Sequence, residues 1–335
     1  MTVSRKQLLY GVLIMGIGGA AYYFGTNFFM KKIEKSVIID ICFDESMQTK
    51  RYATMLADGN ASALLHLFKQ LYEKVSPGLL APSESVKIPR YIHMIWLGSP
   101  LPTAYEKFYQ SWHDYHKTWT FIFWTDHPAN YCRGSIIAND FNQLKNILKT
   151  NGAQEGLSIV VDASQVVYEN KKFFDASNNY GERSDILRYQ ILYEVGGLYV
   201  DSDFQAVRAL DELHYLYDFY TGLQPLDTRY VQLGAALLAA VPNHPILKAC
   251  IEGIKYNQHI VPIVAKTGPL HFTRAFLAHA QEGPYINCAF PASFFYPCGY
   301  DERDASAQQW CKKEAFAVHH WQASWTKPEG FVKRT

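Results

Sequence analysis

The apolar residues between positions 186 and 195 recur at the spacing of one helix face. They stand at Ile186, Leu187, Ile191, Leu192 and Val195, a pattern that predicts a helix. Gly196 and Gly197 follow and are suited to a helix C-terminus. Leu198-Tyr199-Val200 then predicts a short buried strand, and Asp201-Ser202-Asp203 comes where this strand ends. The pattern therefore holds two carboxylates together at a strand end.

Helical and strand patterns alternate along the rest of the chain. Compact apolar runs predict strands at 91–97, 119–124, 157–162 and 231–240. Helical spacing or helix-start signals predict helices at 61–75, 104–115, 139–150, 246–255 and 270–279. The order strand, helix, strand is typical of units whose strands are parallel. We therefore predict an α/β fold with a mixed, mainly parallel central sheet.

An uncharged apolar run from Leu8 to Phe29 precedes this domain. Arg5 and Lys6 stand before it, and Lys31 and Lys32 follow it. About 20 apolar residues suffice for a transmembrane helix, so we expect a membrane anchor over 1–32. A cleaved signal peptide and a buried helix are the alternatives. Residues 33–86 are then expected to form a stem or helical addition, and 87–335 the α/β domain.

Composition excludes several classes of protein. The chain carries 32 Lys and Arg against 31 Asp and Glu, a net charge of +1. Because the basic residues are spread out, they form no stripe that binds a nucleic-acid backbone. Its six cysteines include no C-x-x-C pair, which argues against a zinc site. A 48% hydrophobic content is ample for a large core, so we expect one anchored globular domain and no nucleic-acid partner.

The Asp201-Ser202-Asp203 turn is the strongest candidate for chemistry. Two adjacent carboxylates repel each other unless a cation lies between them. Mg2+ and Mn2+ prefer oxygen ligands, and a neutral imidazole is a good further ligand for Mn2+. His319 or His320, in the late segment Ala317 to Trp325, is the expected third ligand, with His319 preferred. The simpler interpretation of a short Asp-x-Asp is an acidic loop that caps the next element.

Two further sets of residues are candidates for ligand contacts. Ile95, Trp96 and Gly98 end the first predicted strand, where ligands of open α/β sheets bind. The ring of Trp96 can stack on a nucleobase or belong to the core. Asp185 and Arg188 share one helical face and can form an ion pair or bind a common ligand.

The block from helix to Asp-x-Asp resembles the DXD-containing sugar transferases. The similarity is greatest to the Och1-type and inositolphosphoceramide mannosyltransferase-like enzymes (glycosyltransferase family 32-like), and more distant to the glucosyltransferase domain of large clostridial toxins. The residues that match are Ser184, Asp185, Arg188, Tyr189, Asp201 and Asp203. The Ile-Pro-x-x-Ile-His-x-Ile-Trp segment, which ends at Trp96, also matches. Relatives carry an asparagine where this chain has Gly234-Ala235-Ala236, which puts one sugar or acceptor contact in doubt.

The resemblance implies a GT-A-like (Rossmann-like) domain and indicates which residues form its site. Catalytic roles fall to Asp201, Asp203, Asp185 and Arg188, and Mn2+ or Mg2+ binds Asp201, Asp203 and His319 or His320. The expected contacts to a UDP-sugar or GDP-sugar donor are Ile95, Trp96, Gly98, Ser184, Asp185, Arg188, Tyr189, Ser202, Ser324 and Trp325. Ser324 and Trp325 belong to a segment that closes over the diphosphate in related enzymes.

The resemblance implies a metal-dependent glycosyltransferase that transfers a hexose to a hydroxyl of a glycan, lipid or protein, with retention of anomeric configuration. A type II-like single-pass topology follows, in the Golgi or ER lumen if the source is eukaryotic. One alternative is a non-catalytic membrane protein that binds sugar nucleotides or glycans. Another is a haloacid-dehalogenase-type phosphatase, although Phe204-Gln205 departs from the residues expected after that enzyme's Asp-x-Asp.

Overall fold

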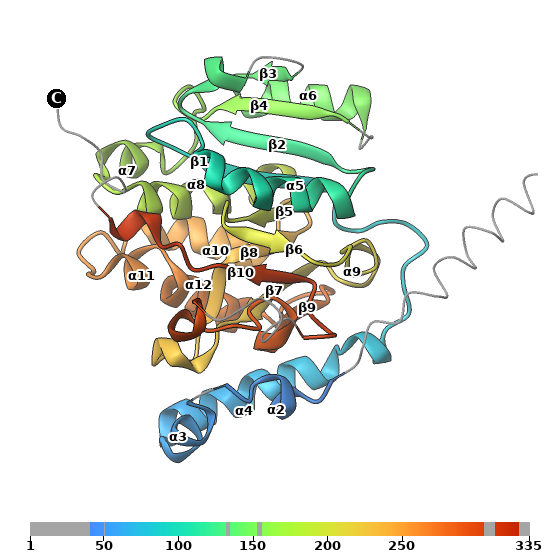
Figure 1. Cartoon of the computed structure of the whole chain (residues 1–335), viewed down its shortest axis with the longest axis vertical. Coiled ribbons are helices and arrows are strands. Elements are labelled where there is room, and N and C mark those ends of the chain that lie inside the picture. Colours follow the sequence, from blue (N-terminus) through green and yellow to red (C-terminus); the bar gives the residue numbers. More distant parts are fainter. Residues whose placement is uncertain (1–40, 50, 132–134, 153–155, 305–311, 328–335) are drawn as a thin grey trace, which may run out of the picture. The chain divides into compact units, whose positions relative to one another are not determined.

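The computed structural model describes residues 41–49, 51–131, 135–152, 156–304 and 312–327 (Figure 1). The anchor predicted from Leu8 to Phe29 lies outside these residues. Within the described ranges, every helix is too short or too polar to cross a membrane. Residues 40–335 form one compact unit, and the candidate site lies entirely within it.

One sheet of eight strands organises the domain, in the order β3-β4-β2-β1-β5-β8-β7-β9. Its strands are β1 Tyr91–Trp96, β2 Thr120–Thr125, β3 Ile136–Ala138, β4 Ser158–Asp162, β5 Gly197–Val200, β7 Phe219–Leu223, β8 Leu233–Ala240 and β9 Asn287–Phe290. The neighbours from β3 to β5 pair in parallel, β8 pairs antiparallel with β5 and β7, and β9 is parallel to β7. The predicted mixed, mainly parallel sheet is confirmed.

A second, two-stranded sheet joins distant parts of the chain. It consists of β6, Phe204–Ala206, and β10, Ala317–His319. The strands pair antiparallel, with His319 opposite Phe204. In Figure 1, β10 and β6 lie beside each other near the end of β5. This pairing brings the late histidine segment to the Asp-x-Asp turn.

Helices α2 to α4 precede β1, and the other helices lie in the connections between the strands. They are α2 Phe43–Ser46, α3 Tyr52–Ala57, α4 Gly59–Lys74, α5 Glu106–Tyr115, α6 Phe141–Asn151, α7 Lys171–Ala176, α8 Tyr180–Val195, α9 Leu213–Leu216, α10 Pro245–Ile254, α11 Ile263–Lys266 and α12 Pro269–His279. The amphipathic helix predicted over 61–75 corresponds to α4. It packs on the domain through Phe68, against Phe276, and Tyr72, against Phe290.

Helix α8 and strand β5 form the centre of the domain. Asn179 caps α8 because its side chain accepts a hydrogen bond from the Glu182 N–H. At the other end, Gly196 and Gly197 have φ angles of 70° and 104°, which favour glycine. A Cβ at Gly197 would also lie 2.9 Å from the Tyr91 carbonyl oxygen. The glycine pair therefore lets α8 turn directly into the strand that ends at Asp201.

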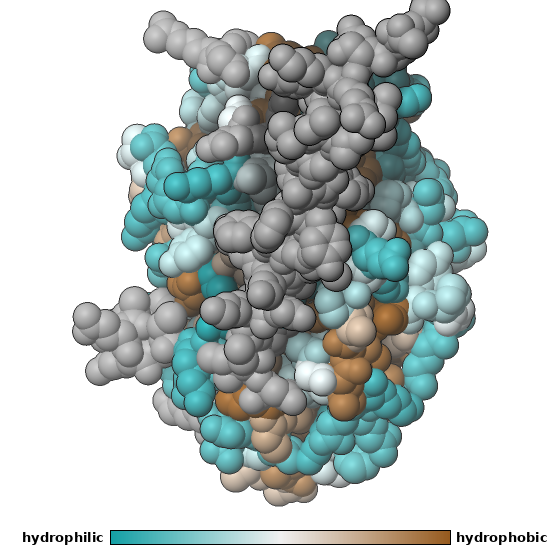
Figure 2. Space-filling model, turned by 90° about the vertical axis from the view of Figure 1, so that its right-hand side faces the viewer, coloured by the Kyte–Doolittle hydropathy of each residue, from teal (hydrophilic) through white to brown (hydrophobic). Residues whose placement is uncertain are grey.

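Large apolar side chains left on the surface are scattered. The most exposed are Val261 at 88%, Val167 at 82% and Leu79 at 68%, and they belong to different segments. On the face shown in Figure 2, brown apolar patches alternate with teal hydrophilic ones. Such dispersed exposure is ordinary for globular domains.

His93 makes stability sensitive to acid. Its ring is fully buried, its Nε2 donates to the Gly196 carbonyl, and its Nδ1 accepts from the Trp124 indole N–H, so both ring nitrogens have hydrogen-bond partners in the core. Burial lowers its pKa to about 4. The unfolded chain then binds a proton more readily than the folded one. His93 should therefore cost about 2 kcal/mol of stability as the pH falls from 7 to 5.

Chemical denaturation at the two pH values measures this loss. His93→Gln keeps one donor and one acceptor without a titrating ring, so its loss between pH 7 and 5 should be about 2 kcal/mol smaller. An equal acid-induced loss in both proteins would show that His93 does not contribute. His214, whose pKa burial lowers to about 3, adds to the total in both proteins.

Candidate functional site

The candidate residues gather at one edge of the sheet. Strand β1 is parallel to both β2 and β5, so their carboxyl ends point the same way. Gly98 follows β1, Asp126 follows β2 and Asp201 follows β5. Ligands of open α/β sheets bind beyond such strand ends, and the site is built there.

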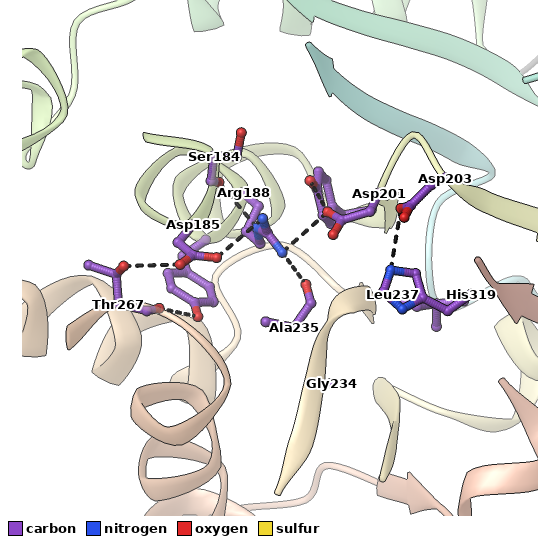
Figure 3. Close-up of polar contacts among 12 residues, drawn as sticks. Ser184, Asp185, Arg188, Asp201, Asp203, Gly234, Ala235, Leu237, Thr267 and His319 are labelled. Atoms are coloured by element: carbon purple, nitrogen blue, oxygen red, sulfur yellow. Dashed lines mark hydrogen bonds and ion pairs between the residues drawn. The ribbon is translucent and has the colours of Figure 1, made fainter. Parts of the chain in front are cut away.

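Asp201, Asp203 and His319 form a compact cluster. The Phe204 N–H donates to the Asp201 carbonyl, which closes a turn and places both carboxylates on the same side. His319 Nε2 lies 3.3 Å from Asp203 Oδ1, a contact that Figure 3 marks with a dashed line. One ligand atom from each of the three residues lies within 4.8 Å of the others. Their positions depend on the β6–β10 pairing as much as on β5.

The second histidine of the pair points elsewhere. His320 Nε2 lies 2.9 Å from Gln205 Oε1, and its ring packs at 4.5 Å on Phe108. Strand β10 ends at His319, and the ring of His320 turns to these other partners while that of His319 faces Asp203. The geometry favours His319 as the third ligand.

The two carboxylates of the turn have different environments. Burial raises the pKa of Asp201, and the Arg188 charge only partly offsets it. Burial also acts to raise the pKa of Asp203, but the His319 charge and hydrogen bonds from His319 and the Gln322 N–H hold it below its usual range. Asp203 is therefore the more readily ionised partner of the pair.

Arg188 connects the cluster to the helix. Its Nη1 donates to the Ala235 carbonyl at 2.5 Å and lies 3.4 Å from Asp201 Oδ1. Its Nη2 lies 3.2 Å from Asp185 Oδ1, the ion pair expected from their spacing. Asp185 Oδ2 in turn accepts from the Thr267 hydroxyl (Figure 3). Burial raises the pKa of Asp185 to about 6, against the opposing effects of Arg188 and Thr267.

This charge distribution fits a divalent cation. Asp185, Asp201 and Asp203 offer three buried or half-buried carboxylates, while Arg188 supplies one buried positive charge. Ionised, the four groups carry a net charge of −2, which is costly in a protein interior without a counter-ion. His319 Nδ1 is also buried without a hydrogen-bond partner. The donor set of two carboxylates and an imidazole suits Mn2+ or Mg2+.

Trp96 and Gly98 lie at the opposite end of the site. Trp96 is half-buried, its indole N–H donates to the Ser99 hydroxyl, and its ring lies 4.8 Å from that of Tyr105. The Gly98 N–H donates to both oxygens of Asp126, which assigns that carboxylate a turn-stabilising role. Ile95 is buried in β1. The half-exposed Trp96 leaves part of its ring available at the strand end.

A row of rings joins the two ends. Tyr105 follows Trp96, Phe108 lies 6.2 Å beyond Tyr105, and His320 lies 4.5 Å beyond Phe108. The His320 N–H donates to the Asp203 carbonyl. A series of ring contacts therefore links Trp96 to the acidic turn.

The remaining candidates differ in accessibility. Ser184, Ser202 and Ser324 are half-buried, and Trp325 is 37% exposed. The Trp325 carbonyl accepts from the Asn179 side chain, which ties the late segment to the start of α8. Tyr189 is fully buried, and its hydroxyl donates to the Thr267 carbonyl. Tyr189 is therefore a buried residue that supports the site through Thr267.

Sequence reasoning missed two supporting residues. The Tyr199 hydroxyl donates to Asp201 Oδ1 at 2.6 Å, and the Arg188 guanidinium lies 4.6 Å over the Tyr199 ring. The Gln322 N–H donates to Asp203 Oδ2. A tyrosine two residues before Asp201 was the available signal for the first, whereas a backbone donor leaves no signal in the sequence.

Residues 102–220 match the family described as "Glycosyltransferase sugar-binding region containing DXD motif". This region belongs to the DXD glycosyltransferase family. The DXD region runs from just before α5 to the start of β7, and contains Asp185, Arg188, Asp201 and Asp203. Trp96 and His319 lie outside it.

Curated relatives match over about half of the chain. Inositol phosphoceramide mannosyltransferase 2 of Schizosaccharomyces pombe is 25% identical over 188 residues, 55% of this chain and 44% of the relative. Mannosyl phosphorylinositol ceramide synthase SUR1 of Saccharomyces cerevisiae is 27% identical over 208 residues, 60% of this chain and 44% of the relative. The matches thus span less than half the length of both relatives.

Solved structures of glycosyltransferases are also similar to this chain. PaToxG glycosyltransferase has a TM-score of 0.41 at 16% identity, over 65% of this chain and 77% of its own. The catalytic domain of alpha-toxin from Clostridium novyi has a TM-score of 0.38 at 11% identity, over 76% of each chain.

Proposed function

We propose that the protein is a metal-dependent glycosyltransferase with a GT-A-like fold, which transfers a hexose from a UDP-sugar or GDP-sugar to a hydroxyl. The observation that carries the proposal is the convergence of Asp201, Asp203 and His319 within 4.8 Å. The two carboxylates of this cluster lie in a region that belongs to the DXD glycosyltransferase family.

The residues divide the binding of the donor between them. Asp203, Asp201 and His319 would hold Mn2+ or Mg2+. When bound, the ion supplies the positive charge that neutralises a leaving diphosphate. Trp96 would stack on the nucleobase, worth about 1–3 kcal/mol by analogy with single-strand stacking. Asp185 would accept hydrogen bonds from donor hydroxyls while Arg188 keeps it ionised.

The proposal also covers the acceptor, the cellular location and the stereochemistry of transfer. The two relatives are named for their action on ceramide lipids, which supports a lipid acceptor. A hydroxyl of a glycan or protein would allow the same chemistry. The uncharged run from Leu8 to Phe29 supports a type II-like membrane anchor, with the domain in the Golgi or ER lumen if the source is eukaryotic. The family resemblance supports retention, which the anomeric signal of the product in proton NMR can determine.

Metal removal tests the proposal most directly. With UDP- and GDP-hexoses as donors, the purified protein should release the nucleoside diphosphate in Mn2+ or Mg2+. Chelation with EDTA should reduce this hydrolysis by at least about a hundredfold, and excess Mn2+ should restore it. Hydrolysis that persists in EDTA would contradict metal dependence. Nucleotide-sugar binding without hydrolysis or transfer to any hydroxyl acceptor would instead indicate a binding protein.

A further inference from the structure

Residues 266–268 join α11 to α12. We call them the corner. They contact one face of α8 through several side chains. The contacted residues form a stripe of Glu182, Asp185 and Tyr189, spaced three and four residues apart so that they share a helix face. Lys266 Nζ lies 2.6 Å from Glu182 Oε1. The Tyr189 hydroxyl donates to the Thr267 carbonyl at 2.7 Å. The corner is therefore held on both sides of Asp185.

Thr267 makes the central contact of this stripe. Its hydroxyl donates to Asp185 Oδ2 at 3.0 Å, while Asp185 Oδ1 faces Arg188 (Figure 3). The two oxygens of one carboxylate thus have different partners, and together these partners fix its rotation. Thr267 is 0% exposed, so a bound substrate cannot touch it. An effect of the Thr267 hydroxyl on a substrate is therefore indirect, and Asp185 is the hydrogen-bond partner through which it can act.

We propose that Thr267 is a positioning residue for Asp185, and that it holds the carboxylate in the orientation that binds the sugar part of the donor. This inference rests on the proposed function, in which Asp185 accepts hydrogen bonds from donor hydroxyls. It adds a residue from outside the DXD region to the recognition of the sugar. Gly268 permits the approach, because a Cβ there would lie 3.2 Å from Asp185 Oδ2.

The charged groups around Asp185 define what Thr267 can change. Arg188 and Glu182 face it from α8, Asp201 from the end of β5, and Lys266 reaches the same stripe from the corner. Burial raises the pKa of Asp185, and the Thr267 hydroxyl lowers it. Loss of the hydroxyl should therefore move the acid limb of sugar-nucleotide binding to higher pH.

Three variants distinguish a role of Thr267 in positioning Asp185 from a role in stabilising the corner. Thr267→Val removes the hydroxyl with little change of shape, and Thr267→Ser keeps it. Asn257→Ala is the matched control, because the Asn257 side chain donates to the Lys266 carbonyl at 3.1 Å and does not contact Asp185. Both Thr267→Val and Asn257→Ala remove one hydrogen bond from the corner. Asn257→Ala also removes the contact of the Asn257 amide with His271 Nδ1 at 2.9 Å, so its loss of thermal stability should be at least as large as that of Thr267→Val.

Calorimetric binding in Mn2+, with each nucleoside diphosphate and its hexose derivative, supplies the decisive comparison. Thr267→Val should bind the diphosphate within about twofold of wild type and the sugar nucleotide about tenfold more weakly. Thr267→Ser should recover binding to within about threefold, and Asn257→Ala should bind both ligands like wild type.

The outcomes distinguish this inference from the proposed function. If the wild type binds neither ligand, the proposed function fails and Asp185 loses its assigned role with it. If the wild type binds and Thr267→Val matches it, only the role of Thr267 is refuted. Equal weakening by Thr267→Val and Asn257→Ala would also refute that role, because loosening of the corner would then suffice.

Discussion

Asp203→Asn should abolish transfer while the protein stays folded. The asparagine oxygen can still accept the Gln322 N–H that Asp203 Oδ2 accepts, so the turn and the late segment keep their hydrogen bond. The charge that would hold the cation is lost. A metal ion contributes several kcal/mol to such reactions, and about 4 kcal/mol corresponds to a rate reduction of about a thousandfold.

Donor hydrolysis, Mn2+ titration and circular dichroism together test this prediction. We expect activity and Mn2+ affinity to fall together while the spectrum stays that of wild type. Asp114→Asn is a suitable control, since Asp114 lies exposed on α5 and pairs with Gln110. Full activity of Asp203→Asn would remove the acidic turn from the mechanism.

Arg188→Met should be the most destabilising single substitution in the site. Arg188 is 5% exposed and faces both Asp185 and Asp201. Methionine fills similar space but leaves the buried Asp185 and the half-buried Asp201 without their positive partner. Removal of one member of a buried ion pair costs about 3–5 kcal/mol. For a domain of this size we expect the melting temperature to fall by about 10 °C.

The pH dependence identifies the cause. Burial already raises the pKa of Asp185, and loss of Arg188 should raise it further. A carboxyl group whose folded pKa is raised binds protons more readily in the folded state, so the difference in stability between the variant and wild type should narrow as the pH falls from 7 to 5. This trend is opposite to that of His93. Arg303→Met, at an exposed arginine on the Tyr300 ring, should change stability by less than about 1 kcal/mol.

Long apolar runs explain why much of the sheet could be predicted. The run at 119–124 became β2 at Thr120–Thr125, and that at 157–162 became β4 at Ser158–Asp162. Both strands are buried, so their sequences are continuously apolar. The Gly196-Gly197 pair marked the end of α8 just as clearly, because few other residues adopt its φ angles.

Short strands were missed because their sequences carry too little pattern. Strands β6 and β10 have three residues each, and each exists because the other pairs with it. Strand β7, Phe219–Leu223, mixes Tyr220 and Thr221 with apolar residues and is defined by its neighbours β8 and β9. Period-2 patterns of this length occur in many loops.

In the site, too, residues close together in the sequence could be predicted, whereas contacts between distant residues could not. Asp201 and Asp203 are readable because one turn contains both. The choice between His319 and His320 required the register of β10 against β6, which the sequence does not reveal. The contact of Thr267 with Asp185 joins residues 82 positions apart, so no local pattern in the sequence indicates it.

The β6–β10 pairing has a consequence for how the protein matures. A ribosome releases Asp201 and Asp203 long before it synthesises His319, and β10 cannot dock on β6 until the last part of the chain has emerged. Until then the carboxylates lack their imidazole partner. Under the proposed function, tight uptake of the ion would therefore require that β10 has been synthesised, and chains cut short before β10 would bind the ion only weakly.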